Sequence, residues 1–178
     1  MNGPSRAIAQ METRAAAFDF ESAFHAHYAR IARVIARVIR DPGRAEELAV
    51  EVLWKFWRTP GAHGEQAGGW LYRTAVRTSL NELRRKVRGD RHESLTDSTP
   101  GAPTPEDVRR AREEQEHVRT VLAALDSRQA ELLLLRSSGL SYEEVAAALD
   151  LNPASVGTLL SRAQQAFRKE FIKRYGEQ

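Results

Sequence analysis

The chain has 178 residues, of which 42% are hydrophobic, enough to bury the core of one medium domain or of two small ones. Lys and Arg number 27 and Asp and Glu 24, so the formal net charge is only +3, and attraction for nucleic acid requires that the cations cluster. The absence of cysteine excludes a disulfide framework, a cysteine zinc site and a thiol redox sensor. No segment has a signal-peptide core or approaches the ~20 apolar residues of a membrane span, so we expect a cytoplasmic protein without membrane insertion.

The N-terminal half is expected to form a mobile tail and then a small helical domain. Residues 1–16 have no regular pattern, and residues 17–92 carry apolar residues at helical spacing in three segments. These segments run from Phe18 to Arg40, from Gly43 to Arg58, and from Ala67 or Gly69 to Val87. The last is strongly basic, because residues 70–92 hold seven Lys and Arg against two Asp and Glu. A loop, Thr59 to Gly69, precedes it.

A proline-rich segment divides the chain. Residues 93–107 hold three prolines and a glycine with hardly any apolar residue, so this stretch cannot bury a core and is expected to be a flexible linker. Residues 108–178 then form a second helical domain. No stretch alternates as a strand would, and the predicted fold class is all-α, with two small helical domains joined by the flexible linker.

The segment from Gly139 to Ala163 has the pattern of a helix-turn-helix. Gly139 can adopt the left-handed conformation that ends one helix, and Ser141 with Glu144 forms a capping box for the next. Asn152 is a good N-cap, and Pro153 suits the first position of the following helix. A plain αα-hairpin in a helical core is the alternative interpretation, but the two-helix spacing favours DNA binding.

Small and polar residues on one side of this motif suit insertion into the major groove. The candidate contacts to an upstream duplex are Ser141, Tyr142, Asn152, Ala154, Ser155, Gly157, Thr158, Ser161 and Arg162. Gly157 costs about 1 kcal/mol relative to alanine in a helix interior, and it either lets the helix backbone approach DNA closely or is tolerated variation.

Three blocks together resemble the bacterial sigma factors of the extracytoplasmic-function type, the initiation subunits of RNA polymerase. Two of them, DPGRAEELAVEVLWKFWR (41–58) and GWLYRTAVRTSLNELRRK (69–86), are similar to the family's second conserved region. The third, VLAALDSRQAELLLLRSSGLSYEEVAAALDLNPASVGTLLSRA (121–163), is similar to its fourth region. The chain departs from common family residues at Arg77, Asn81, Gly157 and Leu159.

The resemblance implies that the C-terminal domain binds the upstream (−35-type) promoter element and the N-terminal domain the downstream (−10-type) element, where the strands separate. Aromatic and basic residues suit exposed bases, each stacked base contributing about 1–3 kcal/mol. The downstream set is Ala62, His63, Gly64, Glu65, Gln66, Trp70, Tyr72, Arg73, Arg77, Asn81, Arg84 and Arg85. For Trp70, core packing is the alternative, and for the arginines a solvated helix face.

The resemblance also implies three partners: core RNA polymerase, promoter DNA and an anti-sigma factor. The polymerase-binding residues would be Glu46, Glu47, Leu48 and Glu51, whose alternative role is that of an ordinary solvated helix face. The polymerase would perform the chemistry, so the chain itself needs no catalytic residue, metal or cofactor. The linker allows the two domains to pack together and to hide both DNA-binding surfaces.

Two other classes of function are an enzyme and a transcription regulator that works without polymerase. An enzyme using His25 and His27 is disfavoured, because residues two apart on a helix point about 200° apart and cannot share a metal. A helix-turn-helix regulator that binds DNA without polymerase remains the alternative function. Whether DNA binding needs core polymerase discriminates between the two.

Overall fold

The computed structural model describes residues 19–93 and 106–176, so the predicted tail and most of the predicted linker lie outside the described residues. Over the described ranges the chain forms seven α-helices and one short 3-10 turn, with no strand. The all-α prediction is confirmed. Within the same ranges, no helix combines the length and the apolar character that crossing a bilayer requires.

The first group of helices is α2 (Phe20–Ile39), α3 (Pro42–Trp57), the 3-10 turn η1 (Pro60–Ala62) and α4 (Ala67–Glu93). Asp19 caps α2 and Asp41 caps α3, each by accepting hydrogen bonds from backbone N–H groups in the first turn. Arg40 adopts a left-handed conformation (φ 55°) between α2 and α3, which turns the chain back on itself. These three helices pack around Ile35, Leu53 and Phe56, all at most 1% exposed.

The second group is α5 (Glu106–Ala124), α6 (Ser127–Ser137), α7 (Tyr142–Leu149) and α8 (Pro153–Tyr175). Helix α5 begins inside the last two residues of the predicted linker, and α4 continues six residues beyond the predicted end at Val87. Both differences arise because charged residues continue a helix where the apolar periodicity has already stopped. Asp126 is the N-cap of α6, and its side chain accepts from the N–H groups of Arg128 and Gln129.

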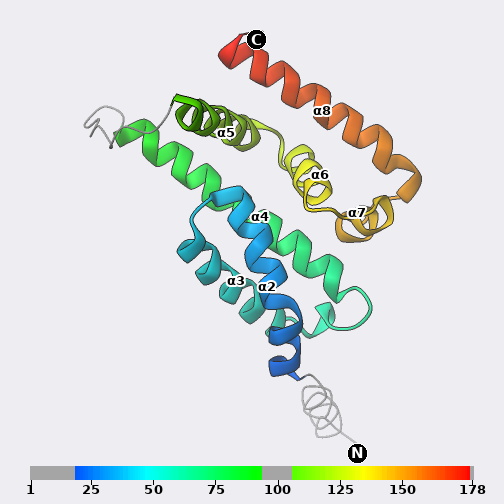
Figure 1. The fold of residues 1–178 in the computed structure, drawn as a ribbon. Helices are drawn as coiled ribbons and strands as arrows, with labels where there is room; N and C mark the ends of the chain where they lie inside the picture. Colours follow the sequence, from blue (N-terminus) through cyan, green and yellow to red (C-terminus); the bar gives the residue numbers. More distant parts are fainter. Residues whose placement is uncertain (1–18, 94–105, 177–178) are drawn as a thin grey trace, which may run out of the picture.

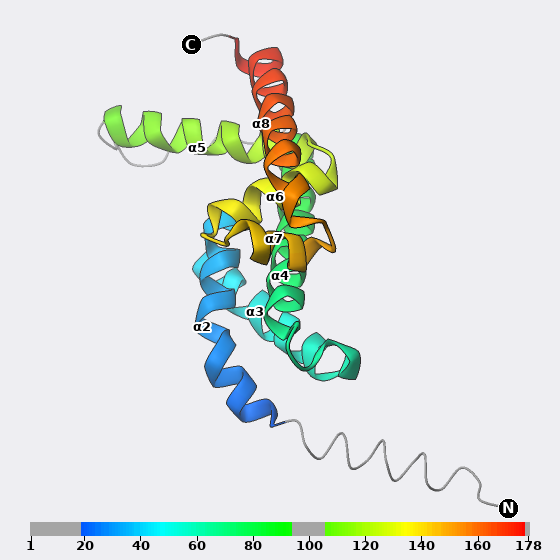
Figure 2. The same ribbon diagram turned by 90° about the vertical axis from the view of Figure 1, so that its right-hand side faces the viewer.

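Helix α4 joins the two groups. It packs against α2 and α3 and also against α5, α6 and α7, and Figures 1 and 2 show it running alongside both sets of helices. One continuous cluster of buried apolar side chains includes Leu71 and Val76 of α4 together with Leu132, Ala148 and Leu149 of the second group. The two halves therefore lie docked together in this structure.

Arg119 of α5 adds a polar contact across the same boundary. Its Nε donates to the carbonyl of Val38 and its Nη2 to that of Ile39, each at 3.1 Å. These carbonyls belong to the last turn of α2 and have no partner within that helix. A side chain of the second half thus completes the capping of a helix in the first half.

Candidate nucleic-acid interface

The predicted helix-turn-helix is formed by α7 and α8, with α6 packed behind them. Gly139 has φ 91° in the turn before α7, and Ser141 and Glu144 form the reciprocal capping box. Asn152 caps α8, and Pro153 occupies its first turn. Asp150, with φ 54°, supplies the left-handed turn between the two helices. The local sequence signals therefore position α8 as predicted.

The outward face of α8 is open to solvent. Ala154, Thr158, Ser161 and Arg162 are exposed, and Ser155 is half-buried. The apolar side of the helix, with Val156, Leu160 and Ala163, is at most 5% exposed. The face thus offers small and hydroxyl side chains followed by one cation, a surface that a major groove can accommodate.

Two residues predicted to contact DNA have their side chains committed to capping. Ser141 Oγ accepts from the N–H of Glu144 at 3.2 Å, and Asn152 Oδ1 accepts from the N–H of Ala154 at 3.0 Å. Both residues remain exposed, so contact with a phosphate is still sterically open to them, but their oxygens already hold the helix N-termini.

Gly157 lies beside an exposed aromatic ring. A Cβ added at Gly157 would lie 3.5 Å from Cε2 of Tyr142, which is itself 44% exposed. The guanidinium of Arg136 lies over the same ring, 5.6 Å from its centroid, which is within the reach of about 6 Å of a cation–π contact. An alanine at this position would make an ordinary van der Waals contact with the Tyr142 ring, so the packing itself does not require glycine.

The basic residues of α4 do not form a free row. Arg77 is half-exposed and pairs with Glu131 of α6, Nε to Oε1 at 2.7 Å. Arg84 is part-buried and donates to three oxygens near the junction of α5 and α6. Arg85 is exposed and pairs with Glu82 at 2.6 Å, and Asn81 is exposed, while Arg73 is half-buried.

The two aromatic residues predicted on α4 lie against the core. Tyr72 is only 8% exposed, with the guanidinium of Arg30 4.9 Å from its ring centroid, so the expectation that it presents its face to a base is not met here. Trp70 is half-buried, with its ring centroid 5.6 Å from that of Phe56. Core packing, the alternative considered for Trp70, therefore describes both rings, because the wide apolar side of α4 turns them toward α2 and α3.

The loop before α4 is open except at its start. Gly64, Glu65 and Gln66 are exposed, whereas Ala62 is 5% exposed and belongs to the core, so it is not available to a base. The ring of His63 is half-buried and its Nε2 lies 2.9 Å from the carbonyl oxygen of Phe56. The exposed part of the loop is thus held at a fixed distance from the end of α3.

The acidic face of α3 is present but lacks its predicted apolar member. Glu46, Glu47 and Glu51 are exposed, whereas Leu48 is 2% exposed and packs in the core. Leu48 is therefore not part of that surface, because its helical position is shared with Val52 on the inward side. Arg44 binds Glu47 at 2.7 Å and lies 3.7 Å from Glu51, and Glu46 has no ion-pair partner within the described residues.

An apolar strip continues that face and was missed by the sequence reasoning. Val50, Trp54 and Trp57 are 48%, 51% and 44% exposed, and the two tryptophan rings lie 4.7 Å apart between centroids. Their spacing of four and three residues on one helix was the available signal. Large apolar side chains that stay in water beside a row of acids are typical of a protein–protein interface.

Two family models match this chain. The model for sigma-70 region 2 matches residues 23–89, and the model for sigma-70 region 4 matches residues 115–166. These ranges coincide with the two groups of helices on either side of residues 94–105. The order of the two regions along the chain is that of the resemblance noted in the sequence.

Curated relatives and a solved structure agree with these matches. The chain is 28% identical over 172 residues to the ECF RNA polymerase sigma factor SigK of Mycolicibacterium vanbaalenii, covering 92% of this chain and 85% of the relative. It is 28% identical over 182 residues to SigK of Mycobacterium tuberculosis, covering 94% and 95%. The structure of CnrH in complex with the cytosolic domain of CnrY superposes with TM-score 0.51 at 17% identity, covering 89% of this chain and 92% of CnrH, and supports the fold.

The chain contains the two sigma-70 regions in order, on helices that present a basic helix and a helix-turn-helix, and the curated relatives match it along nearly its whole length. It is therefore a member of the extracytoplasmic-function sigma factors, which direct promoter recognition and transcription initiation by RNA polymerase.

Proposed function

We propose that the two domains divide the promoter between them, α8 binding the upstream duplex element and α4 with the loop at residues 64–66 binding the downstream element as its strands separate. The observation that carries the upstream part is the open face of α8, where Thr158, Ser161 and Arg162 are exposed on a helix whose other side is core. Such a face fits the width of a major groove.

The proposed contact with the downstream element is supported by the positive charges of α4. Arg73, Arg77, Arg84 and Arg85 lie on one helix, at the end of which the exposed loop residues meet solvent. Backbone phosphates of a separated strand are held by such cations, and their contribution falls as salt rises. The buried ring of Tyr72 and the packed ring of Trp70 leave the cations and the loop as the main candidates for this contact.

The polymerase-binding surface that we propose is the outward face of α3. It combines the acids Glu46, Glu47 and Glu51 with the exposed side chains of Val50 and Trp54, which lie on the same side of the helix as Glu47. Acidic residues would speed docking to a basic partner, and the aromatic side chains would supply the affinity. On this proposal the polymerase, which works in the cytoplasm, carries the chemistry, and the chain contributes no catalytic group.

An anti-sigma factor is proposed as a further partner. The solved structure of CnrH contains a second protein, the cytosolic domain of CnrY. Here a groove of about 720 Å³ lies between the halves, lined by apolar residues of α2, α5, α6 and α8 with Arg37 and Arg136 among them. An apolar groove with basic members would suit a helix that is apolar on one side and acidic at its edges.

The test is run-off transcription over a pool of genomic promoters, with purified core polymerase and with or without this chain. New defined start sites that appear only with the chain would support the proposal and reveal the promoter sequence. Sequence-specific retention of duplex DNA by the chain alone, without new transcripts, would instead favour a regulator that works without polymerase.

A further inference from the structure

We propose that the C-terminal domain is a built-in competitor for the downstream DNA strand, with the carboxylate of Glu131 occupying Arg77 where a phosphate of the strand would bind. The inference rests on the proposed role of α4 in holding that strand. It adds that contacts within the free chain occupy Arg77 and Arg84 of this surface.

The pair formed by Arg77 and Glu131 has the two-point geometry by which guanidinium groups bind phosphates and carboxylates. Nε of Arg77 lies 2.7 Å from Oε1 and Nη2 lies 3.4 Å from Oε2. The side chain of Glu131 is only 5% exposed, whereas that of Arg77 is 50% exposed. A carboxylate so deeply buried needs a cation, and the only one the structure gives it among the described residues comes from the other domain.

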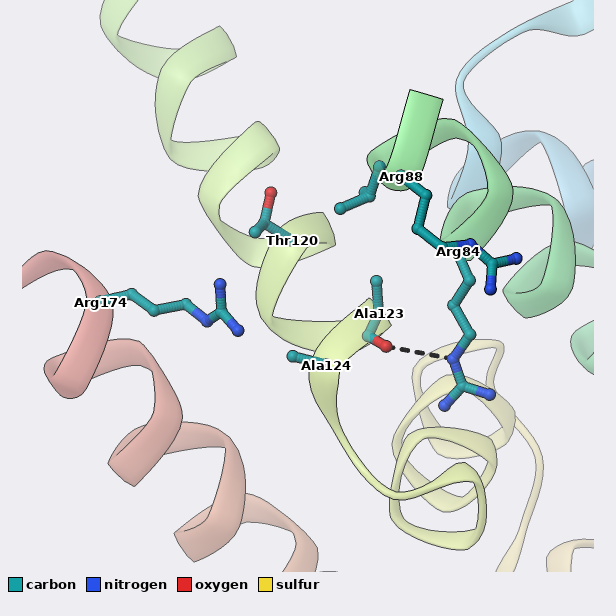
Figure 3. A pocket seen from close by; sticks show the side chains of 7 residues that line it. Arg84, Arg88, Thr120, Ala123, Ala124 and Arg174 are labelled. Atoms are coloured by element: carbon teal, nitrogen blue, oxygen red, sulfur yellow. Dashed lines mark hydrogen bonds between the residues drawn. The ribbon is translucent and has the colours of Figure 1, made fainter. Parts of the chain in front are cut away.

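Arg84 is held by the same domain, as Figure 3 shows for its bond to Ala123. Its Nε donates to the carbonyl of Ala123 at 3.1 Å, its Nη2 to that of Leu125 at 2.8 Å, and its Nη1 to Ser127 Oγ at 2.9 Å. The two carbonyl oxygens lie at the C-terminal end of α5, where the helix dipole is negative, and Ser127 is the first residue of α6. Two arginines about two turns apart on α4 thus find negative partners on α5 and α6, as they would along a nucleic-acid backbone.

The upstream surface is not closed in the same way. Ala154, Thr158, Ser161 and Arg162 of α8 stay exposed while α4 is engaged. Docking therefore engages Arg77 and Arg84 of the downstream surface, while the loop at residues 64–66 and the face of α8 stay exposed, so the expectation that docking hides both DNA-binding surfaces is not met for the upstream one. The free protein is able to present its helix-turn-helix to a duplex, whereas contact of a separated strand with both Arg77 and Arg84 requires α6 and the end of α5 to leave α4.

The effect of such a competitor is a change in population. If only a fraction of molecules is open, the apparent dissociation constant for a single strand is raised by the inverse of that fraction. Weakening the contact should therefore tighten binding without any new contact to DNA. Removing an ordinary structural ion pair would instead leave the affinity for a single strand unchanged or lower it.

The experiment compares the full-length chain with Glu131→Gln, which keeps the shape of the side chain and removes its charge. The matched control is Glu170→Gln, because Glu170 accepts from Arg174 Nε at the same 2.7 Å but within α8. Ser127→Ala is a second and milder variant, since Ser127 is exposed and loses only the contact to Arg84. Circular dichroism checks that each variant is folded.

Two quantities are measured for each variant. Domain opening is followed by energy transfer between dyes on Arg33→Cys in α2 and Lys169→Cys in α8, both exposed positions in a chain that has no cysteine of its own. Affinity is measured by fluorescence anisotropy with a labelled single-stranded oligonucleotide of random sequence at low ionic strength. We expect Glu131→Gln to lower the transfer efficiency and to tighten binding by up to about tenfold, Ser127→Ala to do the same to a smaller extent, and Glu170→Gln to change neither.

Unchanged transfer efficiency and unchanged affinity in folded Glu131→Gln and Ser127→Ala would overturn the proposal and leave the role of α4 untouched. Opening without tighter binding would also overturn it. In that case Arg77→Ala is tested for promoter opening with core polymerase, which separates failure of the competitor proposal from failure of the proposed role of Arg77. Normal opening by Arg77→Ala would mean that the proposed role of Arg77 in the downstream contact is itself wrong.

Discussion

Gly69 at the start of α4 lies against the backbone of Ala148 in α7, where an added Cβ would be 3.4 Å from both Cα and N of Ala148. Its neighbour Gly68 has nothing within 4 Å of the same added atom. A Cβ at Gly69 would just reach the backbone of α7, and a larger side chain would require α7 to move, so this contact is one of those that hold the two halves together.

Gly69→Leu should push α7 away from α4, whereas Gly68→Leu should leave the docking intact. Both changes replace glycine by a good helix former at neighbouring positions, so their effects on helix propensity are similar, about 0.8–1 kcal/mol in favour of the helix. Small-angle scattering of the free chain measures the difference. A larger radius of gyration for Gly69→Leu alone is expected, and equal values for the two variants would contradict the prediction.

Arg84→Ala combined with Arg85→Ala should weaken open-complex formation more than duplex binding by the C-terminal domain. The two guanidinium groups lie on α4, whereas the duplex-binding face is on α8. Each lost phosphate contact should also reduce the slope of the logarithm of the opening equilibrium constant against the logarithm of salt concentration by about 1. Permanganate footprinting of the opened strand, beside a gel-shift assay with an upstream duplex, compares the two steps. An equal loss in both assays would contradict the proposal that α4 binds the downstream element.

Arg162→Ala should reduce retention of the upstream duplex about tenfold or more, because one good contact to a base edge contributes about 1–3 kcal/mol. Lys169→Ala removes another exposed cation of α8, two turns further along. It should weaken binding less and equally for all sequences, as a phosphate contact does. A competition assay between the promoter and a scrambled duplex measures both. Equal discrimination by the two variants would argue that Arg162 does not read a base.

Trp54→Ala should weaken association with core polymerase about thirtyfold or more, because truncating a well-packed aromatic residue of an interface costs about 2 kcal/mol or more. Glu46→Ala should act mainly by slowing association, and the loss should shrink as salt rises. Lys55→Ala, at an exposed neighbouring position on α3, is the control. Biolayer interferometry with immobilised core polymerase separates association from dissociation. Full affinity of Trp54→Ala would exclude the apolar strip from the interface.

Glu82→Gln should lower the free energy of unfolding at neutral pH by about 1.5 kcal/mol, the low end of the contribution of a hydrogen bond to a charged group. Burial raises the pKa of Glu82, but the hydrogen bonds donated by Arg85 and Arg44 outweigh it and bring the pKa below its ordinary value of 4.5. The stabilisation is therefore complete above about pH 4.5 and is lost as the pH falls through the lowered pKa.

Urea unfolding followed between neutral and acid pH checks this dependence. The difference between the parent chain and Glu82→Gln should shrink below pH 4.5. Glu47→Gln, which also loses a contact to Arg44, serves as the comparison, and its effect should be smaller because that side chain is 66% exposed. A difference that stays constant down to acid pH would mean that the charge of Glu82 does not contribute.

Local signals in the sequence determined most of the secondary structure and the family. Gly139, Ser141 with Glu144, and Asn152 before Pro153 act on their own neighbouring backbone groups, so their roles are legible without the rest of the chain. The helix ends that differ from expectation, at Glu93 and Glu106, lie in charged stretches where apolar periodicity gives no signal.

The orientation of side chains that lie near the edge of an apolar face could not be predicted in the same way. Tyr72 was expected to be available to DNA, and Trp70 either to DNA or to the core, and both turn toward the core, whereas Trp54 and Trp57, for which no orientation was predicted, are exposed. Helical spacing assigns residues to faces, but the width of the buried face depends on which helices cover it, and that is settled by packing.

The sequence by itself determined that the chain is all-helical, that residues 139–163 form a helix-turn-helix and that a basic helix precedes the linker. Only the tertiary structure decided that Arg77 meets Glu131, 54 residues away, and that Arg119 caps α2 from 80 residues further along. Capping and periodicity act within a few residues of the chain, whereas pairs of this kind depend on how two separately folded surfaces fit, which no local pattern encodes.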